Sequence, residues 1–218
     1  MSVFSKPGLH DTHKWHNMRI GLLGGSFNPP HQGHLHISLA ALKGLKLDAI
    51  WWLVTPQNPL KTEQPAEMDE RLALCEKIAH HPQIVISDIE RELGTNITYH
   101  TVQRLQKIHP RSEFIWISGM DTALSFHTWN YWHELLAIIP TVHLTRNPAT
   151  SLIRRCPLRL YTKQKHVVIE KAAKYPLQAG TTYWMMQKKM VNISSTELRS
   201  AKSTKVTPNP KSSKTAQA

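Results

Sequence analysis

The residues best suited to chemistry lie in one short stretch, GGSFNPPHQGHLH, which runs from Gly24 to His36. Gly24 and Gly25 permit a sharp turn and leave room for a ligand. His31 and His34 lead into a segment with helical apolar spacing, where backbone N–H groups and the helix dipole attract anions. Their imidazoles add donors whose charge can respond to a phosphate. The stretch therefore predicts an anion site, with phosphate as its natural occupant.

Other interpretations of these histidines stay open. The spacing of His31, His34 and His36 is similar to that of some zinc clusters, although no carboxylate or cysteine lies in the stretch. The three side chains could instead cap a helix and pack at its end. A covalent histidine–nucleotide intermediate would need a base and an orienting partner that the sequence does not identify. Neither a P-loop nor a dinucleotide-binding glycine fingerprint occurs.

A second stretch, ISSTELR, spans Ile193–Arg199. Ser194 and Glu197 fit a capping box, which alone predicts no more than a well-capped helix. Ser195 and Thr196 would then lie in its first turn, and Arg199 about one turn further on can reach back. Hydroxyls, amides and a guanidinium together favour a second phosphate site.

The elements that must position these residues follow from the apolar patterns. Strands are expected at 18–25, 49–55, 83–89, 114–119, 141–146 and 181–186, and helices at 33–45, 68–79, 99–108, 121–137 and 195–201. The segment 150–180 has room for one more strand and helix. This alternation predicts an α/β fold: a Rossmann-like, doubly wound parallel sheet with helices on both faces. Ligands of such sheets bind beyond the carboxyl ends of the strands.

Composition limits the class of protein. The chain has 218 residues, 40% of them hydrophobic and 19% charged, which is typical of a globular protein with a sizeable core. No apolar run approaches the roughly 18 residues of a membrane span, and the first twenty residues lack a signal-peptide core. Two cysteines, Cys75 and Cys156, cannot form a disulfide scaffold. We therefore expect a cytoplasmic protein with no membrane partner.

The positive charge of the chain is concentrated in part at its C-terminal end, which bears on the domain organisation. The net charge of +12 suggests an anionic partner, yet the last nineteen residues contribute four lysines and no acid. We expect a flexible polar arm at 1–17, one domain at 18–201 and a basic, disordered tail at 202–218. A nucleic-acid-binding protein is an alternative that the charge allows, but the chain has no recognisable reading motif.

The two chemical stretches, in this order, resemble the motifs of the HxGH nucleotidyltransferase superfamily. Within it the chain is most similar to the nicotinate-nucleotide adenylyltransferase family of bacteria, over about residues 18–201. Four segments between the motifs extend the resemblance: WWLVTPQNPLK, LGTNITYHTVQRL, FIWISGMDTALSFHTWNYW and TVHLTRNP. Asn28 departs from the pattern, because many relatives have aspartate there. Another HxGH enzyme, such as one acting on phosphopantetheine, is the alternative within the superfamily.

The resemblance implies transfer of AMP from ATP to nicotinate mononucleotide, giving nicotinate adenine dinucleotide and pyrophosphate for NAD synthesis. The mononucleotide phosphate would attack the α-phosphorus of ATP directly, so catalysis would be positioning and charge stabilisation. Mg²⁺ would enter with ATP, without protein side chains as ligands. Neither the choice between acid and amide mononucleotide nor the oligomeric state follows from the sequence.

The resemblance also assigns roles to individual residues. His34, His31 and Arg199 would be catalytic. The ATP phosphates would be bound by Gly24, Gly25, Ser26, Phe27, His31, His34, Lys61, Ser195, Thr196 and Arg199. The mononucleotide would be bound by Thr98, Asp121 and Trp129. Trp129 could instead be a core aromatic residue, and Asp121 a helix cap.

Overall fold

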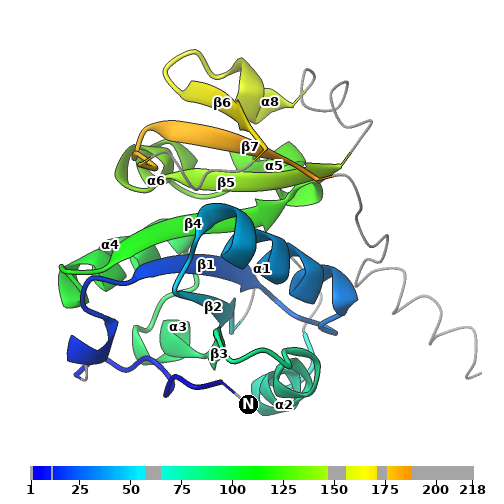
Figure 1. The fold of residues 1–218 in the computed structure, drawn as a ribbon, viewed down its shortest axis with the longest axis vertical. Coiled ribbons are helices and arrows are strands. Elements are labelled where there is room, and N and C mark those ends of the chain that lie inside the picture. Colours follow the sequence, from blue (N-terminus) through cyan, green and yellow to red (C-terminus); the bar gives the residue numbers. More distant parts are fainter. Residues whose placement is uncertain (1, 11, 57–64, 147–155, 171–175, 188–218) are drawn as a thin grey trace, which may run out of the picture.

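The computed structural model describes residues 2–10, 12–56, 65–146, 156–170 and 176–187, which form one seven-stranded sheet (Figure 1). In chain order the strands are β1 (Arg19–Gly25), β2 (Ala49–Val54), β3 (Ile84–Ser87), β4 (Glu113–Gly119), β5 (Thr141–Arg146), β6 (Lys165–Ile169) and β7 (Thr181–Gln187). Every neighbouring pair is parallel, in the spatial order β3-β2-β1-β4-β5-β7-β6. The expected parallel sheet and all six predicted strands are confirmed.

The helices connect these strands. They are α1 (Gln32–Leu45), α2 (Met68–Ile78), α3 (Ile89–Glu92), α4 (Thr98–Ile108), α5 (Met120–Ser125), α6 (Trp132–Ile138) and α8 (Pro157–Leu160), with short 3₁₀ turns η1 (His13–Trp15) and η2 (Phe126–Thr128). Helices are expected within 121–137, and two are found there, α5 and α6, with η2 between them. Four-residue α3 was not predicted, because it is too short to show a helical period. The helix expected at 195–201 lies outside the described residues.

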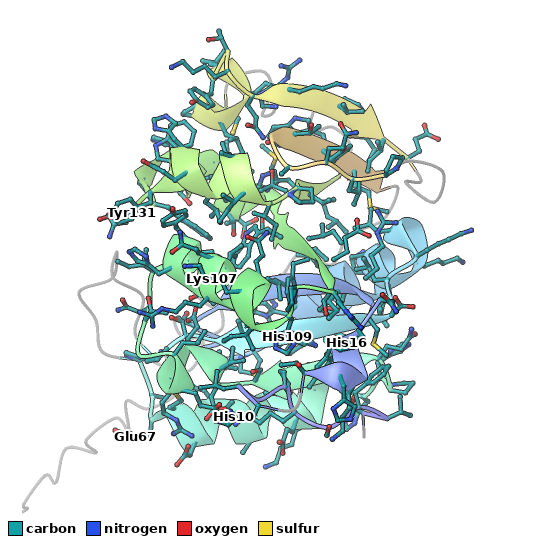
Figure 2. The ribbon with its side chains drawn as sticks, turned by 90° about the vertical axis from the view of Figure 1, so that its left-hand side faces the viewer. His10, His16, Glu67, Lys107, His109 and Tyr131 are labelled. Atoms are coloured by element: carbon teal, nitrogen blue, oxygen red, sulfur yellow. The ribbon has the colours of Figure 1, made fainter. Side chains whose placement is uncertain are left out.

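Both faces of the sheet are covered, as the adjacent tryptophans of β2 illustrate. Trp51 and Trp52 are fully buried, and alternation along a strand sends them to opposite faces. Trp51 belongs to the core cluster that includes Leu105 of α4, whereas Trp52 belongs to the cluster that includes Cys75 of α2. Figures 1 and 2 show α1 and α4 on opposite sides of the sheet. Two-sided burial explains why these strands appear as continuous apolar runs.

The strand order reverses between β1 and β4. The chain leaves β1 towards β2 on one side and leaves β4 towards β5 on the other. Because the two connections diverge, the carboxyl ends of β1 and β4 border the place where ligands of open parallel sheets bind. Gly25 ends β1 and Gly119 ends β4, so the chain places the GGSF loop beside the start of α5.

The N-terminal segment differs from the expected loose arm. Trp15 is 1% exposed and meets Trp51 edge-on, with ring centroids 4.8 Å apart. The Val3 N–H donates to the Pro82 carbonyl at 2.9 Å, and Lys6 forms an ion pair with Asp88. Burial of a large indole offsets the entropy of ordering the segment. The tail at 202–218 lies outside the described residues, and none of the described helices is long and apolar enough to cross a membrane.

Candidate active site

The two histidines of the GGSFNPPHQGH stretch form the turn that begins α1. The side chain of His31, the N-cap residue, accepts a hydrogen bond at Nδ1 from the Gly33 N–H at 3.1 Å. Nδ1 of His34 accepts from the His31 N–H at 3.2 Å. The two bonds are reciprocal, as in a capping box, with imidazoles in place of the usual hydroxyl and carboxyl. The helix-capping interpretation of these histidines is therefore confirmed.

This turn changes the expected source of anion-binding donors. The N–H groups of His31 and Gly33 bond to imidazoles, and the His34 N–H donates to the His31 carbonyl at 3.0 Å. These three amides are thus already used inside the turn, contrary to the expectation of free N–H groups. Because Nδ1 of neutral His34 accepts, its hydrogen lies on Nε2, which can donate to an anion.

Burial keeps His34 neutral. Removal from water, with the nearby His31 ring adding a smaller effect, lowers the His34 pKa to about 3. The ring centroids of the two histidines are 3.9 Å apart. At neutral pH His34 is therefore a fixed neutral donor, and it differs from the proton-responsive imidazole that the sequence suggested.

Aromatic packing holds the His34 ring in place. Phe27 is 1% exposed, stacks on Trp52 with centroids 5.0 Å apart, and lies 4.7 Å from the His34 ring. The Trp52 Nε1–H donates to Ser38 Oγ at 2.8 Å, and Ser38 Oγ donates to the His34 carbonyl at 2.9 Å. Phe27 therefore contributes mainly by packing, although the resemblance grouped it with the phosphate contacts. Preorganised groups of this kind are what charge stabilisation requires.

Gly24 has a packing role that the sequence did not predict. A Cβ at Gly24 would overlap the indole ring of Trp116 on neighbouring β4. The backbone of Gly24 has no positive φ angle, so the conformational freedom of glycine is not what this position needs. Close approach of Trp116 explains the glycine. Gly25 follows it, and its carbonyl accepts from the Thr55 N–H at 3.0 Å, joining the ends of β1 and β2.

On the α4–α6 side of the sheet, Trp129 follows η2. Its half-buried ring stacks on Phe126 at 4.8 Å and meets Trp116 edge-on at 5.7 Å. Trp116 thus lies between Gly24 and Trp129 and joins the two parts of the site. Asp121 lies in the first turn of α5 and is exposed, whereas Gly119 is the N-cap residue. The helix-cap interpretation of Asp121 is therefore wrong.

Thr98 is the first residue of α4 and is half-buried. Thr101, one turn later, is fully buried and donates from Oγ1 to Glu90 Oε1 at 2.9 Å. Burial raises the pKa of Glu90, while hydrogen bonds from the Thr55 and Thr101 side chains oppose the shift. Glu90 thus joins the end of β2 to α4, and Thr98 begins a helix that is anchored to the β1–β2 side.

Several predicted site residues lie outside the described residues. They are Lys61, Ser195, Thr196 and Arg199. The described structure brings together the remaining candidates around the carboxyl ends of β1 and β4: Gly24, Gly25, Ser26, Phe27, His31, His34, Asp121 and Trp129. Thr98 lies at the adjoining end of α4, next to Tyr99, whose ring is 5.6 Å from Tyr131. Tyr131 is half exposed and points outwards (Figure 2).

Three buried polar residues near these loops were not predicted from the sequence: Ser38, Glu90 and Arg71. The sequence spacing could have indicated the burial of Arg71, because it lies four residues before Cys75 and therefore on the buried side of α2. A cation inside an apolar helical stripe is unusual and points to buried partners.

Comparisons with known proteins identify the family and agree with the fold. The profile of the cytidylyltransferase-like family matches residues 22–201. The chain is 40% identical to the probable nicotinate-nucleotide adenylyltransferase of Cereibacter sphaeroides over 183 residues, covering 84% of this chain and 97% of that protein. Against the corresponding protein of a Ruegeria species the identity is 39%, with 84% and 96% covered.

The solved structure of Plasmodium falciparum nicotinic acid mononucleotide adenylyltransferase, complexed with NaAD, has the same fold. Its TM-score is 0.61 at 18% identity, and the match covers 84% of this chain and 83% of that one. A parallel sheet with an HxGH turn at the strand-order reversal, together with the family match, makes the chain a member of the cytidylyltransferase-like nucleotidyltransferases. Within them it belongs to the nicotinate-nucleotide adenylyltransferase family.

Proposed function

We propose that this protein transfers AMP from ATP to nicotinate mononucleotide, giving nicotinate adenine dinucleotide and pyrophosphate in NAD biosynthesis. The observation that carries the proposal is the neutral His34, held with Nε2 as donor at the reversal of strand order. The acceptor phosphate is already anionic, so in-line attack on the α-phosphorus needs no general base. A fixed donor beside the phosphates stabilises the charge of the transition state.

In this proposal the ATP phosphates lie over the β1–α1 turn, against Gly24–Phe27, His31 and His34. Lys61, Ser195, Thr196 and Arg199 complete the phosphate contacts, with Arg199 on the leaving pyrophosphate. The histidine nitrogens suit phosphate oxygens, whereas Mg²⁺ prefers oxygen ligands. Mg²⁺ would be held by ATP oxygens and water, and it would supply neutralisation of phosphate charge.

The mononucleotide lies on the α4–α6 side, with its pyridine ring against Trp129, its ribose near Asp121 and its ring substituent near Thr98. The half-buried Trp129 ring, backed by Phe126 and Trp116, supports this placement. The proposal includes a cytoplasmic location, which suits two cysteines that are both unpaired. Residues 18–201 are the proposed catalytic domain.

The direct test is pyrophosphate release with ATP and Mg²⁺, offering nicotinate mononucleotide, nicotinamide mononucleotide and phosphopantetheine in parallel. We expect nicotinate mononucleotide to give by far the highest kcat/KM. Release with phosphopantetheine alone would keep the phosphate site and reject the assignments of Thr98, Asp121 and Trp129. No release with any acceptor would reject the proposed reaction.

Replacing Trp129 by alanine is expected to raise KM for the mononucleotide about tenfold while changing kcat less, because stacking on an aromatic ring contributes roughly 1–3 kcal/mol. Steady-state kinetics with ATP saturating would measure the effect. Trp129→Phe, which keeps a stacking ring, serves as the control and should restore most of the affinity. An unchanged KM in a destabilised Trp129→Ala protein would instead show that the ring only packs against Phe126 and Trp116.

A further inference from the structure

Arg71 is a cation buried beneath the phosphate-binding turn. It lies on α2 and is 1% exposed. Burial lowers its pKa from the ordinary value, with opposing contributions from Cys75 and the exposed Glu67, yet a guanidinium stays protonated in proteins. Within the part of the chain that the structure describes, no ion pair joins Arg71 to a carboxylate. Its hydrogen bonds must therefore account for its place in the core.

The guanidinium donates to backbone carbonyls from three separate segments. Nη1 donates to the Ser26 carbonyl at 2.7 Å and to the Thr55 carbonyl at 2.8 Å. Nη2 donates to the Pro56 carbonyl at 3.0 Å, and Nε donates to the Ala66 carbonyl at 2.8 Å. One side chain thus joins the GGSF loop, the end of β2 and the residues before α2. The rigid fork of a guanidinium can satisfy all four acceptors, whereas a lysine ammonium has only three donors.

The hydrogen bond to the Ser26 carbonyl lies next to Phe27, whose ring contacts His34. Phe27, the next residue, has a φ angle of 45°, in the left-handed region that bulky residues rarely adopt. Such a conformation persists only where its surroundings hold it. Arg71 holds the carbonyl on one side of Phe27, while the Phe27 ring packs against His34 at 4.7 Å and Trp52 at 5.0 Å.

We propose that Arg71 is a positioning residue: by fixing the Ser26 carbonyl it holds Phe27 over His34, and so sets the place of the His34 donor. This rests on the proposed function, in which His34 contacts the ATP phosphates. Arg71 acts through the loop without touching substrate. Its loss would therefore change the chemical step and the surroundings of His34 more than binding of the mononucleotide.

The test is Arg71→Lys, which keeps the charge and removes the fork. We expect kcat to fall about tenfold or more, since a donor displaced by a fraction of an ångström loses much of its transition-state stabilisation, while KM for the mononucleotide stays within about twofold. Histidine-labelled NMR supplies a second readout that does not depend on activity. His34 should not titrate between about pH 5 and 8 in the wild type, and should titrate there once the loop over it loosens.

The control is Arg91→Lys, the same chemical change at an exposed arginine that pairs with Asp69 and Asp88. It should leave both kcat and the His34 titration unchanged. His31 is the titratable residue that faces His34, with ring centroids 3.9 Å apart, so the spectrum of His34→Gln is needed to assign the His34 signal.

A folded Arg71→Lys protein with wild-type kcat and an untitrated His34 would overturn the proposal. Should this variant fail to fold, Phe27→Leu tests the same route. It replaces the aromatic ring that packs against His34 by a smaller side chain and leaves the hydrogen bond from Arg71 to the Ser26 carbonyl in place. It should make His34 titrate near neutral pH, and an unchanged titration would overturn the route through Phe27. A wild-type protein with no pyrophosphate release would reject the proposed reaction, while the NMR titrations would still decide the role of Arg71.

Discussion

Replacing His34 by alanine is expected to lower kcat by about 100-fold or more while leaving the fold intact. Removal of one preorganised donor to a developing negative charge typically costs about 10²–10³ in rate. In the proposed reaction His34 is such a donor, because its Nδ1 accepts from the His31 N–H and its pKa of about 3 keeps it neutral with a hydrogen on Nε2. Steady-state pyrophosphate release would measure kcat, and circular dichroism would confirm the fold.

Two further variants separate catalysis from helix capping. In the His34→Asn variant, the side-chain oxygen can accept from the His31 N–H in place of Nδ1. This shorter side chain has no donor at the position of Nε2, so activity should stay low. The longer side chain of His34→Gln can place an N–H near Nε2 and should recover part of the rate. Near-normal turnover of His34→Ala would reject the catalytic assignment.

Acidification below about pH 6.5 is expected to destabilise the protein, with His143 on β5 as one identified cause. His143 is fully buried, with Nδ1 2.7 Å from Ser118 Oγ and the ring 5.2 Å from Trp184. Burial, with a smaller contribution from His166, lowers its pKa to about 3. Between about pH 6.5 and pH 3 the unfolded chain therefore binds a proton that the folded protein does not. The free energy of unfolding should fall by about 1.4 kcal/mol per pH unit from this group.

Urea unfolding at several pH values between about 7 and 5 measures this dependence. The wild type should lose about 2 kcal/mol over that range from His143 alone. His143→Gln should be less stable at neutral pH but should show a shallower slope, because the titrating group is gone. Equal slopes for the two proteins would show that His143 is not responsible. His34, whose pKa is also lowered to about 3, contributes in the same direction and is unchanged in both proteins.

Sequence periodicity was sufficient for six of the strands and for the longer helices of the fold. Strands buried on both faces must be continuously apolar, so AIWWLV could be recognised as β2 without knowledge of its neighbours. The amphipathic pattern after the GGSF loop predicted α1 for the same reason. Position 15 shows the limit: a lone tryptophan in a polar segment has no period, so its burial against Trp51 could not be foreseen.

The chemical motif likewise predicted where the candidate site lies, but it did not predict the protonation state of the residues there. Types and spacing of residues predicted an anion-binding turn at His31 and His34, since these properties depend only on local chain geometry. Which nitrogen of His34 carries the hydrogen was decided by the reciprocal bond to the His31 N–H. Its neutrality was decided by burial, to which Phe27 and Trp52 packing contributes.

The amino-acid sequence by itself thus determined six of the strands, most of the helices between them and the family, and it predicted an anion-binding turn. Tertiary structure alone decided that Gly24 is needed for Trp116, that Asp121 is not a helix cap, and that Arg71 joins three segments. The physical reason is one of range. Periodicity and capping act over a few residues, whereas close packing, burial of charge and pKa values depend on groups that meet only in the folded chain.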